Sequence, residues 1–96
     1  MKIELKELLE ILTSFLEEEI GESIDLNSDS KLFGGSGPLD SMSLVNLLVE
    51  LEEYVEDKLD ITITLADEKA MSRRTSPFSR VDNLLNYINE RIEANG

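Results

Sequence analysis

The stretch GPLDSMSLVNLLVELEE, residues 37–53, predicts the start of a helix and places a lone serine at that start. Asp and Ser are both favoured at helix N-termini, because their side chains accept hydrogen bonds from backbone N–H groups in the first turn. From Ser41 to about Asp57 apolar residues recur every three or four positions, the spacing of a helix with one buried side. The predicted buried side comprises Leu44, Val45, Leu48, Leu51 and Val55, and another face comprises Ser43, Asn46, Glu50, Glu53 and Asp57.

Two further stretches, residues 2–20 and residues 81–92, show the same helical spacing. Gly21 is a plausible end for the first of these helices. Residues 21–40 are rich in Ser, Asn, Asp, Gly and Pro and predict a long loop between the first two helices. The apolar positions are Leu5, Leu8, Leu9, Leu12, Phe15, Leu16 and Ile20 in the first helix, Val81, Leu84, Leu85, Ile88 and Ile92 in the last, and Ile24, Leu26, Leu32 and Phe33 as loop residues that pin the loop to the core.

The segment between the second and last helices has a mixed pattern. DITITL, residues 60–65, has the composition of a strand, but no second strand is evident to pair with it, so we interpret it as an extended connector. Residues 65–72 can form a short helix, and residues 72–79 predict a loop because Pro77 prevents a continuous helix. The expected fold is all-α: a small four-helix bundle with three long helices and one short helix, in a single domain over residues 1–96.

Composition narrows the classes of function. The formal net charge of −12 disfavours binding to nucleic acid or to anionic membranes, and any partner that uses this charge should present Lys and Arg. The chain has no Cys and no His, so the common nucleophile–base pairs, the usual zinc ligands and disulfides cannot be built. No apolar run is long enough to span a bilayer. We expect a cytoplasmic, monomeric protein without membrane insertion that is not an enzyme and that must borrow any thiol it uses.

Two motifs in the long loop resemble ligand sites. Asp25, Asn27 and Asp29 alternate as in an EF-hand calcium loop, but Ser30 and Ser36 occupy the positions where that loop needs Gly and a bidentate Glu. FGGSGP, residues 33–38, is not followed by the Gly-Lys-Ser/Thr of a nucleotide-binding loop. We therefore interpret the first motif as a polar turn and the glycines as positions that let the chain turn onto the second helix.

Ser41 has two interpretations. The simpler one is that Asp40 and Ser41 only cap the second helix. The other is that the hydroxyl carries a group, because a phosphate esterified there would face the positive end of the helix dipole and free backbone N–H groups. The acidic face of the same helix would then offer a docking surface to basic enzymes.

The stretch SKLFGGSGPLDSMSLVNLLVELEE, residues 30–53, resembles the acyl carrier proteins, which carry 4′-phosphopantetheine. The order of an amphipathic first helix, a long loop, a serine opening the second helix, a short third helix and a last helix is similar to that family over the whole chain. The resemblance implies that a separate phosphopantetheinyl transferase attaches 4′-phosphopantetheine from coenzyme A to Ser41. It implies that Asp40 helps to engage the transferase and its metal ion.

The resemblance also assigns contacts with partner enzymes that load and use acyl groups and have basic docking patches. Met42 and Val49 match apolar partner-contact positions, and we expect them near the exposed side of the helix. Glu52 and Glu53 match acidic recognition residues, and we expect both to be exposed. The core residues that would also line an acyl pocket are Leu44, Val45, Leu48, Leu84 and Ile88.

The expected function is that of a stand-alone acyl carrier protein in fatty-acid, lipid or polyketide-type biosynthesis. Ser43 and Asn46 are uncharged where housekeeping fatty-acid carriers are usually acidic, and residues 66–80 form a longer segment made locally basic by Arg73, Arg74 and Arg80. These departures favour a specialised carrier. SPFSRVDNLLNYI, residues 76–88, is also similar to carriers of aminoacyl groups such as D-alanine, so an aminoacyl carrier stays open as an alternative. An acidic helical adaptor or calcium-responsive protein is a further alternative function.

Overall fold

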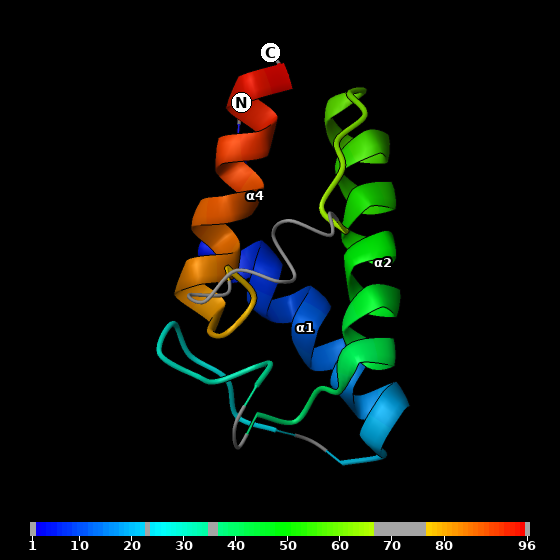
Figure 1. The fold of residues 1–96 in the computed structure, drawn as a ribbon, viewed down its shortest axis with the longest axis vertical. Helices are drawn as coiled ribbons and strands as arrows, with labels where there is room; N and C mark the ends of the chain where they lie inside the picture. Colours follow the sequence, from blue (N-terminus) through cyan, green and yellow to red (C-terminus); the bar gives the residue numbers. More distant parts are fainter. Residues whose placement is uncertain (1, 23, 35–36, 67–76, 96) are drawn as a thin grey trace.

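The computed structural model describes residues 2–22, 24–34, 37–66 and 77–95. These residues form three α-helices and no strand: α1 (Leu5–Ile20), α2 (Ser41–Leu59) and α4 (Val81–Asn95) (Figure 1). The all-α class and the three long helices are therefore confirmed. The short helix predicted over 65–72 falls, from position 67 onward, outside the described residues. α1 packs against both α2 and α4 and lies between them (Figure 1).

α1 begins three residues later than predicted, because the first residues of the chain bind elsewhere. Ile3 is buried, its N–H donates to Asn89 Oδ1 of α4 at 2.9 Å, and Asn89 Nδ2 donates to the Ile3 carbonyl at 3.2 Å. The helix then starts where the N–H of Glu4 donates to Glu7 Oε1 at 3.0 Å. It ends as predicted at Gly21, whose φ of 82° is a left-handed conformation that glycine adopts without strain.

The core is built from the predicted sides of the three helices, except at Ile20, which is 41 % exposed at the end of α1, and at Val45 of α2. Leu44, Leu48, Leu51 and Val55 are completely buried, but Val45 is 37 % exposed and its predicted burial is wrong. Successive helical residues are rotated by about 100°, so Val45 lies well round from Leu44 on the edge of the buried side. Leu47, three residues from Leu44 and four from Leu51, fills the opposite edge and is completely buried.

The long loop packs against the core as expected. Leu32 is buried, and Ile24, Leu26 and Phe33 are partly buried against it. The N–H of Leu39 donates to the Leu32 carbonyl at 2.9 Å, which closes the loop just before α2.

Gly37 is required at this closure. A Cβ at position 37 would lie 2.7 Å from the carbonyl carbon and oxygen of Leu32, inside van der Waals contact. The N–H of Gly37 also donates to the carbonyl of Gly34 at 3.0 Å, and Gly34 itself has a φ of 86°. Gly34 and Gly37 therefore turn the chain onto α2, as the sequence predicts, while Gly35 lies outside the described residues.

The calcium-like motif in the loop forms a hydrogen-bonded turn. Asn27 Oδ1 accepts from the N–H of Asp29 at 2.9 Å, and the Ser30 hydroxyl lies 2.9 Å from the N–H of Asn27, which donates to it. The carbonyls of Ser30 and Ser28 accept the N–H groups of Val81 and Asp82 at 3.0 and 2.9 Å. The motif therefore helps to satisfy the first turn of α4, in agreement with its interpretation as a polar turn.

The connector after α2 has neither helix nor strand over residues 61–66. It begins at Asp60, whose φ of 56° ends α2 in the left-handed conformation. Ile63 and Leu65 are buried while Thr62 and Thr64 are exposed, so the alternating composition lays one side of the connector on the core.

Candidate functional site

Ser41 is the first residue of α2, and its side chain is exposed. The hydrogen bond from the N–H of Leu39 to the Leu32 carbonyl lies directly before it and orders the chain where the helix starts. At this position the backbone N–H groups of the first turn point away from the helix body, and the helix dipole favours negative charge. The hydroxyl is thus open to modification, and a phosphate on it would meet a favourable field.

Asp40 caps α2 as predicted. Its Oδ1 accepts the N–H of Ser43 at 2.8 Å, and its own carbonyl accepts the N–H of Leu44 at 2.9 Å. The hydrogen bonds from the Ser43 backbone and hydroxyl hold the pKa of Asp40 below its usual value. The carboxylate is therefore ionised and ordered beside Ser41, so the capping interpretation of Asp40 is confirmed.

An exposed apolar stripe follows Ser41 along α2. Met42 is 79 % exposed, Val49 is 43 % exposed, and Val45 stands between them. We call Met42, Val45 and Val49 the apolar stripe. Residues three and four apart lie on one side of a helix, so these three side chains form one surface. The predicted exposure of Met42 and Val49 is confirmed. Val45, predicted to be buried, lies on the same exposed surface.

Glu52 and Glu53, predicted to act together, face different surroundings. Glu53 is exposed as expected. Glu52 is half-buried, and its Oε2 accepts the N–H of Leu65 at 2.6 Å and the N–H of Ala66 at 3.2 Å. The expected full exposure of Glu52 is therefore wrong, because its carboxylate holds the connector against α2. Its docking role stays a prediction.

A second polar cluster joins α1 to the last turns of α2. The Tyr54 hydroxyl donates to Glu7 Oε2 at 2.6 Å, and Lys58 forms an ion pair with the same oxygen. The hydrogen bonds from Lys58, Tyr54 and the Glu4 backbone lower the pKa of Glu7 from 4.5 to about 2. Contact with Glu7 raises the pKa of Tyr54 and of Lys58. The sequence pattern does not reveal this cluster, because its members are about fifty residues apart.

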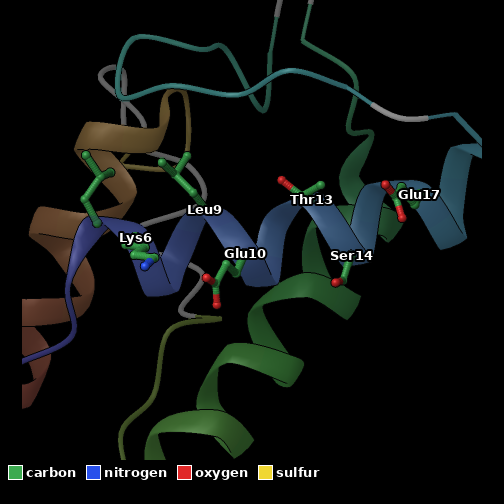
Figure 2. A pocket seen from close by; sticks show the side chains of 7 residues that line it. Lys6, Leu9, Glu10, Thr13, Ser14 and Glu17 are labelled. Atoms are coloured by element: carbon green, nitrogen blue, oxygen red, sulfur yellow. The ribbon is translucent and has the colours of Figure 1, made fainter.

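Of the five predicted acyl-pocket residues, all but the exposed Val45 are core residues. Leu44, Leu48, Leu84 and Ile88 are completely buried, which confirms their place in the core. A separate open hollow of about 680 Å³ runs along α1 and is lined by residues of that helix from Leu5 to Glu17 (Figure 2). Ser41 does not line it, so this hollow is distinct from the candidate modification site.

Neither a metal cluster nor a membrane span is found in the described ranges. Within them, no group of three or more His, Cys, Asp or Glu side chains could hold a metal ion. Likewise, no helix in those ranges is long and apolar enough to cross a bilayer.

Comparison with protein-family models, with curated proteins and with solved structures finds no match to this chain. The candidate site consists of an exposed serine at a helix start, an ordered carboxylate beside it, and an exposed apolar stripe on the same helix.

Proposed function

We propose that the chain is an acyl carrier protein modified on Ser41 with 4′-phosphopantetheine and is not itself an enzyme. The observation that carries the proposal is the exposed Ser41 hydroxyl at the first residue of α2, between the capping Asp40 and the exposed Met42. Helix capping alone does not account for the exposed apolar stripe beside Ser41. The proposal includes a carrier-type four-helix fold, with the short helix that the sequence predicts over 65–72.

The residues at Ser41 fit the phosphate end of the group. The hydroxyl is exposed, and the N-terminus of a 19-residue helix favours the negative charge of a phosphodiester. Because Asp40 is tied to the N–H of Ser43, the first turn is ordered before any group is attached. The bound group would supply the thiol that a chain without Cys lacks, and acyl cargo would be held there as a thioester.

The chain's own residues then present the modified serine to other proteins. Asp40 orders the first turn, and we propose that it also engages the transferase and its metal ion. The apolar stripe gives partner enzymes a hydrophobic contact, while Glu53 gives them a carboxylate for Lys or Arg. The acidic contact is assigned to Glu53 alone, because the carboxylate of Glu52 binds the connector.

The direct test is enzymatic modification followed by intact mass measurement. The full chain is incubated with coenzyme A and a broad-specificity phosphopantetheinyl transferase. We expect the wild type to gain the mass of one phosphopantetheine group and Ser41→Ala to gain none. Ser14→Ala is the matched control, because Ser14 is also an exposed serine on a helix, and it should be modified like the wild type.

Two outcomes would refute the proposal: a wild type that gains no mass, or a Ser41→Ala variant that still does. The mass of the protein isolated from its own cells then separates the cargo classes. A retained fatty or hydroxyacyl group would favour a lipid or polyketide-type pathway, and a retained alanyl group would favour the aminoacyl alternative.

A further inference from the structure

The interface between α1 and α2 opens on one side into a groove, which shares Val49 and Glu53 with the partner contacts proposed above and extends onto α1. Two adjoining hollows, of about 460 and 300 Å³, are each lined by both helices and share Glu50. The apolar side chains that line them are Ile11 and Phe15 of α1 and Val49 and Tyr54 of α2. We call these two hollows the α1–α2 groove. Ser41 lies outside it.

The rim of the groove is formed by carboxylates. They are Glu10, Glu18 and Glu19 of α1 and Glu50 and Glu53 of α2, all exposed. Neither hollow has a Lys or Arg in its lining. In the described ranges, no hydrogen bond or ion pair engages any of these five side chains.

Within the part of the chain that the structure describes, other carboxylates on the same two helices have bonding partners, unlike those of the rim. Glu7, one turn from Glu10, binds Lys58 and Tyr54, and Glu52, next to Glu53, binds two backbone N–H groups. The exposed rim therefore repels itself, and a positively charged partner would relieve that repulsion.

The shape of the groove selects the kind of cation. The rim carboxylates spread along α1 from residue 10 to residue 19, about 13 Å at the rise of a helix. In the part of the chain that the structure describes they do not converge on a point that could hold a metal ion. The floor is partly apolar, and Val49 in it is 43 % exposed. An elongated partner with an apolar row between positive charges matches both features.

We infer that the α1–α2 groove binds a basic amphipathic helix of a partner protein, with its apolar row on Val49 and Tyr54 and its Lys or Arg side chains beside Glu18 and Glu50. A second copy of this chain does not fit, because each copy carries a net charge of −12. The inference extends the partner contacts of Val49 and Glu53 in the carrier proposal to the carboxylates of α1 and names the kind of partner, but it does not require Ser41 to be modified.

The test uses the full ¹⁵N-labelled chain and a synthetic helical peptide of about 12 residues in which Leu and Lys repeat at helical spacing. A scrambled peptide of the same composition has no apolar face and serves as the peptide control. We expect the amphipathic peptide to shift the amide resonances of residues 10–19 and 46–54 at moderate salt, and the scrambled peptide to bind at least about fivefold more weakly.

Paired variants separate the groove from general acidity. Glu18→Gln/Glu50→Gln should weaken peptide binding about five- to tenfold, whereas Glu90→Gln/Glu93→Gln, exposed acids on α4 with the same change in net charge, should change it less than about twofold. Equal weakening by both pairs, or resonance shifts spread evenly over α4, would overturn the inference. Repeating the titration with Ser41→Ala keeps this result distinct from the fate of the carrier proposal, since binding should be unchanged.

Discussion

The two halves of α2 differ in what their outward sides do. In the C-terminal half, Tyr54 and Lys58 bind Glu7 of α1, and Glu52 binds the connector. In the N-terminal half, the outward side carries Met42 and its neighbours in the apolar stripe, which contact solvent. One helix is thus anchored at one end and left exposed at the other. This arrangement holds a candidate modification site on a rigid element while its side chains remain available to partners.

The sharpest test of this difference replaces the same residue type in each half. Val55 is completely buried and Val49 is 43 % exposed. Val55→Ala should cost about 2–3 kcal/mol of unfolding free energy, because it removes buried methyl groups and leaves a cavity. Val49→Ala should change stability by less than about 0.5 kcal/mol, because lost contact is offset by the better helix propensity of Ala. Urea denaturation measures both.

Equal losses of stability in the two variants would break the comparison, since the outer side of the N-terminal half would then be part of the packed structure. A Val49→Ala variant that is stable but slower to be modified by the transferase would sharpen it.

The second test uses the neighbouring acids. Glu52→Ala should destabilise the protein by about 1–2 kcal/mol, because the N–H groups of Leu65 and Ala66 lose their charged acceptor. Glu53→Ala should stay within about 0.5 kcal/mol of the wild type, because the side chain is exposed. Thermal denaturation of both variants checks this. If Glu53→Ala is the less stable of the two, the role assigned to Glu52 is wrong.

These acids also show how far the sequence predicts the structure. Helical periodicity shows which side of a helix is apolar. The three helices α1, α2 and α4 and most of the core could therefore be predicted from it. It places Val45 and Leu47 less well, because both stand at the edges of the buried side and only the neighbouring elements decide which edge is covered. Glu52 looks like Glu53 in the sequence. Its acceptor role depends on a connector thirteen residues further along the chain.

The candidate site divides in the same way. Asp40 and Ser41 could be located because capping is local and the resemblance of residues 30–53 to carrier proteins points to them. The α1–α2 groove could not be predicted, because its rim joins Glu18 to Glu50 only through the packing of α1 on α2.

The third test concerns the anchor between the helices and its dependence on pH. The pKa of Glu7 is lowered from 4.5 to about 2, so its ionised form stabilises the fold fully above pH 4.5, and this contribution is lost as the pH falls toward 2. Glu7→Gln should therefore be less stable than the wild type at pH 7, by about 1 kcal/mol for a partly solvated cluster. The difference should shrink as the pH is lowered.

Urea denaturation of both proteins between pH 7 and pH 2.5 measures that difference, and comparing the two proteins removes the contributions of all other acids. A gap between wild type and Glu7→Gln that is constant over this range would mean that the charge of Glu7 does not anchor α1 to α2.

The smallest expected effect lies on the exposed side of α2 and is kinetic. Glu53→Gln should slow phosphopantetheine transfer to Ser41 about two- to threefold at low salt, because an exposed carboxylate mainly steers the encounter with a basic enzyme. The difference should vanish at about 0.5 M salt, where the Debye length is only a few ångströms. Glu93→Gln, an equally exposed acid on α4, is the control for net charge and should have no effect of its own. Equal slowing by both variants would mean that the charge of the whole molecule steers the encounter. The exposed side of α2 would then not be a specific docking surface.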